Sequence, residues 1–435
     1  MKRLFAIAVA AFALASCSGD DGKTHIYLQR FFGECGAEYG GATNVAKAEG
    51  ECGIMTALIN RFNAENPDIQ VDVNVIAWPG YPQLAAQMAA RDPPDLVTMH
   101  TGVISDYAAE DLLEPVEPYL KAAKISPDDF TDTSRLAITI DNRVYGLPWD
   151  THGGLFHINT ALFEKAGLMR GGKPVLPNSA EELLAHARQF KQRTGKAYLI
   201  QSNVGDTAYA ARNQYTYMMA LGVTLFPDPK HIRLTTPEGR RVAQFFRRIN
   251  REGLGTENMD TPAAIAAFMN GEGGIYPTGT WMIGSFQQES VTPGRPLFKN
   301  YAVFPYPRLW GERVEYVSGH SWVVPKRERS AKQHEAIARF FRFMADHNFD
   351  WVRTGHLPAF KSVLADPRFE ALPHRKDIAL LAEIGRPLPG YVRRQNAIEG
   401  IVGEEMVAGF TGQKPIDVAL KQAETRTNTL LGELN

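Results

Sequence analysis

The stretch IMTALINRFNAENPDIQVDVNVIAW (Ile54–Trp78) predicts a helix followed by a strand, and this succession decides the fold class. Its first apolar residues recur at positions 54, 55, 58, 59 and 62, which is helical spacing. Asn66-Pro67-Asp68 then ends the predicted helix just after Glu65. Apolar and polar residues alternate from Ile69 to Trp78, as they do in a strand with one buried face.

The sequence on either side continues this alternation of helices and strands. Thr24–Phe32 predicts a strand before the quoted stretch, and Tyr81–Ala90 predicts a helix after it. Asp95–Met99 is a short apolar strand that opens into a predicted loop, His100-Thr101-Gly102. Because strands alternate with helices, we expect an α/β fold with a parallel sheet covered by helices.

A second unit follows, reached through a turn and an extended crossing at Asn142–Trp149. Ser179 and Glu182 form a capping-box pattern at the start of one of its helices. No internal repeat or low-complexity segment interrupts the chain, and the segments near 140–150, 300 and 355 read as crossings. The further predicted elements are strands at 154–159, 300–304 and 321–324 and helices at 180–193, 261–270 and 335–345.

Length and composition describe a globular protein of two or three domains. The chain has 435 residues, of which 44% are hydrophobic, which is enough for full cores. Its formal net charge is -1, or -3 (45 basic against 48 acidic residues) once Lys2 and Arg3 leave with the leader. Because nucleic-acid binding requires a basic excess on one face, we predict no nucleic-acid partner.

Residues 1–17, MKRLFAIAVAAFALASC, resemble a bacterial lipoprotein signal peptide. A basic start precedes an apolar run that is shorter than the ~20 residues a membrane span requires. Leu14–Cys17 resembles a lipobox, which predicts lipidation of Cys17, and residues 18–23 read as a polar tether. The alternative is an ordinary cleaved signal peptide in which Cys17 is incidental. We expect an extracytoplasmic protein, in the periplasm or at the cell surface, held to the membrane by a lipid.

The other two cysteines, Cys35 and Cys52, lie in a Gly-rich segment after the first strand. Cysteines in an oxidising compartment are expected to pair, so we predict a disulfide. The alternative is a metal site, but no histidine or further cysteine lies nearby in the sequence to complete a tetrahedral set. We therefore predict no metal.

The sequence lacks the common enzyme motifs. It has no G-x-S-x-G elbow, no phosphate-binding Gly-rich loop, and no EF-hand spacing. His334-Glu335 begins like a zinc-protease motif, but Ala338 stands where the second histidine should be. Ser318 and His320 are close in sequence, which does not establish a catalytic pair. A glycosidase-type pair of carboxylates stays open, since spacing alone does not exclude it.

Seven segments in order resemble the extracellular solute-binding proteins of family 1, the sugar-binding (maltose-binding-like) receptors of bacterial ABC importers. The resemblance covers nearly the whole chain after the leader. Its segments are ALINRFNAENPDIQVDV (57–73), WPGYPQLAAQMAARDPPDLVTM (78–99), VYGLPWDTHGGLFHINTALFEKAGL (144–168), FMNGEGGIYPTGTW (268–281), YAVFPYP (301–307), HSWVVPK (320–326) and FFRFMADHNFDWVRTGHLPAF (340–360). The cysteine-bearing insert after the first strand departs from many relatives.

The resemblance implies a two-lobed periplasmic-binding-protein fold (type II), with discontinuous lobes joined by hinge strands. We place residues 24–149 and 302–354 in the first lobe and residues 150–301 and 355–435 in the second. It also implies capture of a carbohydrate by hinge closure, delivery to an ABC transporter permease, no cofactor, and a monomer. The alternatives are a secreted lipoprotein that hydrolyses glycans and a structural envelope lipoprotein.

A sugar site requires aromatic faces for the C–H side of a pyranose ring and polar groups for its hydroxyls. In open α/β sheets such residues lie at the carboxyl ends of strands. Trp281, preceded by Gly279 and Thr280, stands where the family has a stacking tryptophan or a Gly-rich contact. The alternative for Trp281 is a place in the core.

The resemblance extends to residues of both lobes and the crossings. His100 and Thr101 match the family's first-lobe contact loop, and relatives place a carboxylate for hydroxyls near Asp150, which can alternatively cap a turn. A lone loop histidine is also often only solvated. The full set of further candidates is Phe31, Glu34, His100, Thr101, Asp150, Thr151, His152, Gly319, His320, Arg393, Arg394 and Asn396.

Overall fold

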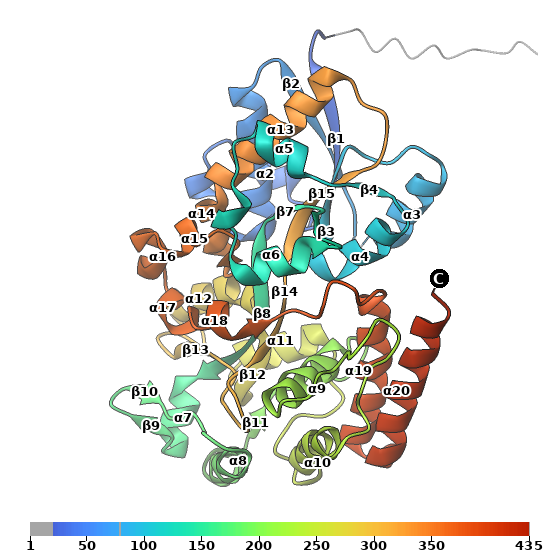
Figure 1. Ribbon diagram of the computed structural model, residues 1–435. Helices are drawn as coiled ribbons and strands as arrows, with labels where there is room; N and C mark the ends of the chain where they lie inside the picture. The colour runs from blue at the N-terminus through green and yellow to red at the C-terminus, as the bar shows by residue number, and fades with distance from the viewer. Residues whose placement is uncertain (1–20, 78–79, 435) are drawn as a thin grey trace, which may run out of the picture.

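β1 (Thr24–Arg30) lies between β2 (Ile69–Val75) and β3 (Leu96–His100) in the first sheet of the computed structural model, which describes residues 21–77 and 80–434 (Figure 1). β2 and β3 pair with it in parallel, which confirms the predicted parallel pairing for these three strands, whereas the sheet as a whole is mixed. β15 (His320–Pro325) comes from much later in the chain and adds antiparallel to β3. β4 (Leu113–Glu114) completes the order β2-β1-β3-β15-β4.

α2 (Gly50–Glu65) covers the first sheet with the face that its apolar spacing predicts. Its Phe62 packs edge-on against Phe340 of α13 (Ala331–Asp346), with ring centroids 5.3 Å apart. Burial of these apolar faces against the sheet stabilises both helices, since a helix of this length gains most of its stability from tertiary packing. The predicted helical residues are all buried: Ile54, Met55, Leu58, Ile59 and Phe62.

β8 (Asp150–Asn159) is the central strand of the second sheet. Its first residues pair with β16 (Leu357–Pro358), its third and fourth with β14 (Glu315–Ser318), and the rest with β12 (Gly273–Gly279) and β13 (Tyr301–Pro305). The order is β11-β12-β8-β14-β17, where the outer strands are β11 (Ala197–Leu199) and β17 (Gly385–Arg386). One strand thus ties together segments more than 200 residues apart in sequence.

Helices of the second lobe cover this sheet, and their buried faces form two core clusters that are separate from the core of the first lobe (Figure 1). α8 begins at the predicted capping residue Ser179, whose hydroxyl accepts a hydrogen bond from the Glu182 amide. The longer helices are α7 (Thr160–Ala166), α8 (Ala180–Thr194), α9 (Ala208–Ala220), α10 (Pro237–Arg251), α11 (Thr261–Met269), α12 (Ile283–Val291), α19 (Gln395–Thr411) and α20 (Ile416–Gly432).

Shorter elements connect the two lobes and fill their edges. The strands are β5 (Thr139–Ile140), β6 (Arg143–Val144), β7 (Leu147–Pro148), β9 (Met169–Arg170) and β10 (Lys173–Pro174). The helices are α1 (Gly36–Tyr39), α3 (Tyr81–Ala89), α4 (Thr101–Ala109), α5 (Glu117–Ala122), α6 (Asp132–Ile138), α14 (Asn348–Trp351), α15 (Lys361–Leu364), α16 (Pro367–Ala371), α17 (Arg375–Ile378) and α18 (Leu381–Ile384). No helix among the described residues is both long and apolar enough to span a bilayer.

Two segments that connect the sheets lie in direct contact with each other at the crossings. The chain leaves the first sheet after β7 and enters β8 at Asp150, and it returns at Gly319, between β14 and β15. A Cβ at Gly319 would lie 2.3 Å from the carbonyl oxygen of Asp150, so only glycine fits there. The Trp149 amide donates to the His320 carbonyl at 2.8 Å, which fastens one crossing to the other.

The strand pairing differs from the predicted division of the chain. We placed residues 302–354 with the first lobe, but β13 and β14 pair with β8, so residues 302–318 lie in the second sheet. Ala359 and Phe360, placed with the second lobe, lie in the core of the first. An isolated strand pattern does not reveal which sheet the strand joins, because the pairing is decided by distant residues.

The predicted loop at His100-Thr101-Gly102 is also wrong. His100 ends β3, and Thr101 begins α4 without an intervening loop. The Thr101 amide donates instead to the carbonyl of Gly319, on the return crossing. The carbonyl of Gly319 thus accepts from the first amide of α4, which has no side-chain cap from His100. The helix can therefore begin directly at the end of β3.

The predicted disulfide between Cys35 and Cys52 is present, with the two Cα atoms 6.1 Å apart. It joins the segment after β1 to the first turn of α2 and excludes the metal interpretation of these cysteines. The same segment is held by Arg30, whose guanidinium donates to the carbonyls of Phe31 and Gly33 and to the Thr56 hydroxyl. The residues that follow β1 are therefore fixed on both sides.

Loss of the disulfide should destabilise the protein without unfolding it. For the double variant Cys35→Ser, Cys52→Ser, we expect the free energy of unfolding to fall by about 3 kcal/mol, because a bridge over this many residues restricts the unfolded chain. Urea unfolding followed by tryptophan fluorescence measures this change. Dithiothreitol should lower the midpoint of the native protein to that of the variant, and an unchanged midpoint in both cases would contradict the prediction.

An acid-sensitive ion-pair network joins α8 to the end of α10. Arg188 contacts both carboxylate oxygens of Glu252 at 2.6 and 2.9 Å, and Arg248 contacts the same carboxylate at 2.8 Å. The hydrogen bonds from Arg188, followed by those from Arg248, lower the pKa of Glu252 to about 2. A lowered folded-state pKa stabilises the protein above the ordinary pKa of glutamate, and the contribution is lost as the pH falls toward 2.

Glu252→Gln should therefore lower the melting temperature at pH 7 and reduce its dependence on pH between about 5 and 2. Calorimetry across that range provides the measurement. Glu257→Gln is the matched control, because Glu257 is exposed and should change neither quantity. Equal pH dependence in the native protein and the Glu252 variant would rule out this role.

Candidate functional site

A cavity of about 120 Å³ opens in the second lobe beside the crossings. Its walls come from β8, β12, β14, the start of α9 and the residues that follow β11 and β12. Both hydroxyl and aromatic groups line it, which is the mixture that sugar recognition requires. The lining residues are His152, Gly153, Gly154, Ser202, Asp206, Tyr209, Arg212, Thr261, Tyr276, Pro277, Thr278, Gly279, Trp281, Tyr306, Glu315, Tyr316 and Ser318.

Trp281 lies half-buried on the cavity wall, directly after β12. A Cβ at Gly279 would fall 2.0 Å from the Trp281 ring, so the glycine lets the indole lie over its own strand. The ring meets His152 edge-on with centroids 5.7 Å apart, and the Arg212 guanidinium lies 6.0 Å from the indole centroid. These neighbours fix the ring while part of it stays open to the cavity.

Arg212 is the cation that lines the cavity, and its charge is already paired. Its Nε and Nη2 donate to the two carboxylate oxygens of Glu399 at 2.6 and 3.0 Å. Burial acts to lower the pKa of Arg212, but the ion pair with Glu399 raises it above its ordinary value. The guanidinium is therefore held in one orientation, with Arg212 and Glu399 together close to neutral.

Buried polar groups complete the wall on the side of β12 and β14. The Ser202 hydroxyl lies 3.0 Å from the Tyr276 hydroxyl. Burial raises the pKa of Glu315 well above its ordinary value, so this side chain is held as a neutral acid. Its Oε2 has no hydrogen-bond partner among the described residues. A neutral carboxyl group can both donate to and accept from a hydroxyl, as an amide does.

Histidines surround the buried carboxylate of Asp150 at the crossings. Asp150 Oδ2 lies 2.8 Å from His320 Nδ1 and accepts from the Trp351 indole at 2.7 Å. Its Oδ1 lies 3.4 Å from His152 Nδ1 and 3.1 Å from the backbone nitrogen of His320. Both oxygens of Asp150 thus have partners within the protein, and these partners hold the carboxylate in one orientation.

The imidazoles around Asp150 have different charge states. Burial acts to raise the pKa of Asp150, but His320 and His356 lower it well below its ordinary value, so the group is ionised. Burial lowers the pKa of His152 to about 4, which leaves that ring neutral near pH 7. Burial acts to lower the pKa of His356, but Asp150 and Glu51 raise it above its ordinary value. His356 Nε2 lies 2.6 Å from the Glu51 carboxylate.

Phe31 and His100 bring the first lobe to this cluster. Their rings stack with centroids 5.0 Å apart and planes 12° from parallel. The Tyr81 hydroxyl lies 2.7 Å from His100 Nδ1 and accepts from the His100 amide. Burial, followed by the nearby His320, lowers the pKa of His100 well below its ordinary value, so the ring is neutral. The cluster therefore spans both lobes.

Some predicted site residues hold the crossings together rather than line the cavity. The Gly319 amide donates to the Thr101 hydroxyl at 3.2 Å. Thr151 points instead toward α6, where its hydroxyl lies 3.1 Å from that of Ser134. Thr280 is fully buried, with its hydroxyl 3.2 Å from His356 Nδ1. Of the predicted residues, His152, Gly279 and Trp281 line the cavity.

The remaining predicted residues lie away from the cavity. Glu34 is exposed, and its carboxylate accepts from the Gly36 amide. Arg393 pairs with Glu110 at 3.0 Å, and the Arg394 amide donates to Asp106, which joins the start of α19 to α4. Asn396 is exposed on the first turn of α19. Cys17, the predicted lipidation site, lies outside the described residues.

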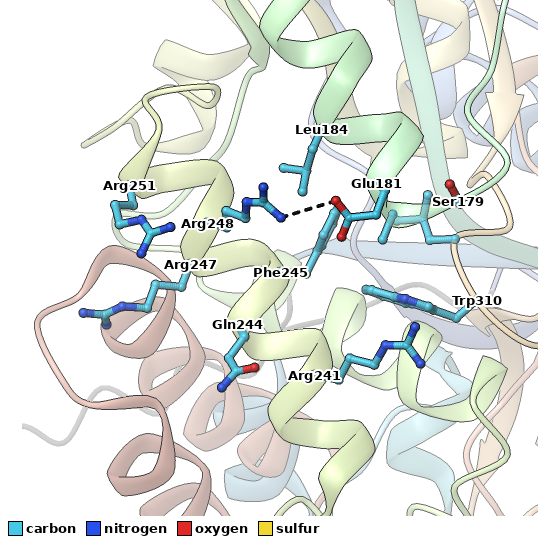
Figure 2. Close-up of a pocket in the computed structure, with 12 residues that line it drawn as sticks. Ser179, Glu181, Leu184, Arg241, Gln244, Phe245, Arg247, Arg248, Arg251 and Trp310 are labelled. Carbon is cyan, nitrogen blue, oxygen red and sulfur yellow. Dashed lines mark hydrogen bonds and ion pairs between the residues drawn. The ribbon is translucent and has the colours of Figure 1, made fainter.

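Figure 2 shows a second cavity, on the outer surface of the second lobe between α8 and α10. It measures about 530 Å³, and arginines line one side of it. Arg248 pairs with Glu181 across the cavity, and the Arg241 guanidinium lies 5.5 Å from the Trp310 ring centroid. None of the residues of the crossings lines it, so we place the candidate site in the smaller cavity.

Several cavity residues were missed from the sequence. Tyr209 and Arg212 lie three positions apart at the start of α9, and Ser202 and Asp206 follow β11. Ser202 and Asp206 could have been predicted as residues that follow a strand. However, β11 has only three residues, and the sequence analysis did not predict it. Glu51 and His356 come together across 305 residues, and no local pattern indicates such a pair.

Two large sheets with separate cores and a polar cavity beside the strands that join them define a two-lobed binding protein. The family profile described as "Bacterial extracellular solute-binding protein" matches residues 57–377. The chain belongs to this family, which agrees with the resemblance found in the sequence.

Three similar proteins illustrate the match. A binding protein of Brucella abortus (strain 2308) is 23% identical over 396 residues, 85% of this chain and 88% of that protein. The sn-glycerol-3-phosphate-binding periplasmic protein UgpB of Escherichia coli O6:K15:H31 is 22% identical over 409 residues, covering 88% of this chain and 90% of UgpB. The sugar-binding protein MalE from Xanthomonas citri has the same fold (TM-score 0.75), with 19% identity, 94% of this chain and 98% of MalE covered.

Proposed function

We propose that this chain is the substrate-binding component of an ABC importer and that it captures a neutral sugar or sugar-like solute. The observation that supports this most is the half-buried indole of Trp281 on the wall of a cavity otherwise rich in hydroxyl and carboxyl groups. An indole face covers the apolar side of a pyranose ring, while Ser202, Thr278 and Glu315 supply donors and acceptors for hydroxyls.

The charges in the cavity favour a neutral solute over a phosphate. Arg212 is already neutralised by Glu399, His152 is neutral near pH 7, and Asp206 adds a carboxylate. Phosphate binding is strengthened by a free Arg or Lys that can form charge-assisted hydrogen bonds, and the cation of this cavity is already paired. The name of UgpB gives a phosphorylated ligand, and that of MalE from Xanthomonas citri gives a sugar. The charges in this chain favour the second of these two classes.

We propose that the solute is enclosed by closure of the lobes about the crossings at Trp149–Asp150 and Gly319. A cavity of about 120 Å³ is smaller than the ~300–1,000 Å³ of typical ligand pockets, so a sugar requires the lobes to separate for access. A solute that contacts both lobes binds the closed state more tightly and shifts the population toward it. His100, which is partly exposed and whose ring centroid lies 6.1 Å from that of His152, is the first-lobe group placed to meet it.

The proposal extends to the cellular setting. The chain would work outside the cytoplasm as a monomer, anchored through a lipid on Cys17, and would deliver its unaltered solute to a membrane permease. The family of binding proteins, together with the lipobox-like leader, supports this part of the proposal. Catalysis forms no part of the proposal, since the family that matches this chain is one of solute-binding proteins.

A thermal-shift screen tests the proposed solute class. We expect at least one neutral mono- or oligosaccharide to raise the melting temperature, since a ligand that binds only the folded state stabilises it. Chromatography of the recovered sugar should show it unchanged. Stabilisation by polyol phosphates alone would contradict the neutral class, and the appearance of shorter products would support the hydrolase alternative.

Trp281→Ala should weaken binding of the sugar found in that screen at least about tenfold, which corresponds to about 1.4 kcal/mol of lost stacking. Isothermal titration calorimetry measures the affinity. The matched control is Tyr27→Ala, which removes an exposed aromatic ring from β1, away from the cavity. An unchanged affinity in the folded Trp281 variant would remove this residue from the site.

A further inference from the structure

We propose that Asp150, His152 and His320 form a binding site for a divalent transition-metal cation of the Zn²⁺ class. One ligand atom from each residue, a carboxylate oxygen and two imidazole nitrogens, lies within 4.8 Å of the other two. All three residues are buried, so the arrangement is not an accident of mobile surface side chains. The inference concerns a cation and does not depend on the identity of the solute.

The spacing of these atoms matches one face of a metal tetrahedron. Zn²⁺ binds imidazole nitrogen and carboxylate oxygen at about 2.0–2.1 Å, so neighbouring ligands in a tetrahedral site lie about 3.3 Å apart. Asp150 Oδ1 lies 3.1 Å from His320 Nδ1 and 3.4 Å from His152 Nδ1. Two edges of the face are thus already at the required length, and small rotations of the rings would complete the third.

The surroundings of the three residues suit a bound cation. The Trp351 indole donates to Asp150 Oδ2 at 2.7 Å, and His320 Nδ1 lies 2.8 Å from the same oxygen. Oδ1 accepts from the His320 backbone amide at 3.1 Å and lies within 3.4 Å of both imidazoles. Such outer hydrogen bonds orient the ligands of metal sites.

The combination of ligands indicates the class of metal. Two imidazoles and one carboxylate favour zinc and its first-row neighbours over Mg²⁺ or Ca²⁺, which prefer sites made only of oxygen. Three protein ligands leave a fourth tetrahedral position for water or a solute oxygen. Because His152 also lines the cavity, a cation can reach the site from there, and a solute hydroxyl in the cavity would lie beside it.

Metal titration of the chain, prepared without an added polyhistidine segment and dialysed against a chelator, tests the site. We expect Co²⁺ to bind at one equivalent with the strong visible absorption of tetrahedral cobalt, and Zn²⁺ to displace it. Calorimetry with Zn²⁺ should give the same stoichiometry. No saturable binding of either cation would overturn the proposal.

His152→Gln and Asp150→Asn should each weaken Zn²⁺ binding at least tenfold while circular dichroism confirms the fold. His231→Gln is the matched control, because this exposed histidine also contacts a carboxylate, that of Asp228, but far from the crossings. Loss of binding in the His231 variant alone would assign the metal to the surface and refute the site.

X-ray absorption of the zinc-loaded native protein decides the question even where a buried variant fails to fold. A first shell with two imidazoles and nitrogen or oxygen neighbours at about 2.0–2.1 Å would support the site. A shell of oxygen atoms alone would overturn it. Neither result bears on whether a sugar binds, so failure here is distinguishable from failure of the proposed function.

Discussion

The buried carboxylate of Asp150 is the constraint on which the join between the lobes depends. It stands where the chain first enters the second sheet, and it binds the backbone and ring of His320, where the chain returns to the first. The Trp351 indole, from α14, donates to the same group. Moving a charge from water into the protein interior is costly, so the buried carboxylate depends on hydrogen bonds from these groups. The hydrogen bonds in turn hold three chain segments together at Asp150.

The cavity follows from that junction. His152 is two residues beyond Asp150 on β8, so the orientation of the junction places its ring on the cavity wall and against Trp281. Gly319 allows the two crossings to touch, and Gly279 allows the indole to lie over its strand. The Cys35–Cys52 disulfide holds the segment that follows β1, and Phe31 in this segment contacts His320. Groups of both lobes, Phe31 and His100 of the first and His152 of the second, therefore meet at one polar centre, which motion of the lobes would have to rearrange.

The sequence predicted the local elements well. α2, β2, α3 and α8 lie within a few residues of their expected bounds, because their apolar periodicity and capping residues act over short distances. The start of α4 was missed, since the Thr101 amide is satisfied by Gly319 rather than by a local cap. The candidate site was predicted in part: His152, Gly279 and Trp281 line the cavity, whereas Tyr209, Arg212 and Glu315 were not anticipated.

The sequence by itself determined the α/β class, the pairing of the two cysteines, and the presence of an indole after a strand that ends in glycine. Each of these follows from patterns within a few tens of residues. Only the tertiary structure decided that residues 302–318 belong to the second sheet, that Arg212 is neutralised by Glu399, and that Asp150 is enclosed by histidines. Those facts depend on contacts between residues far apart in the chain, and such contacts form only when the whole chain packs.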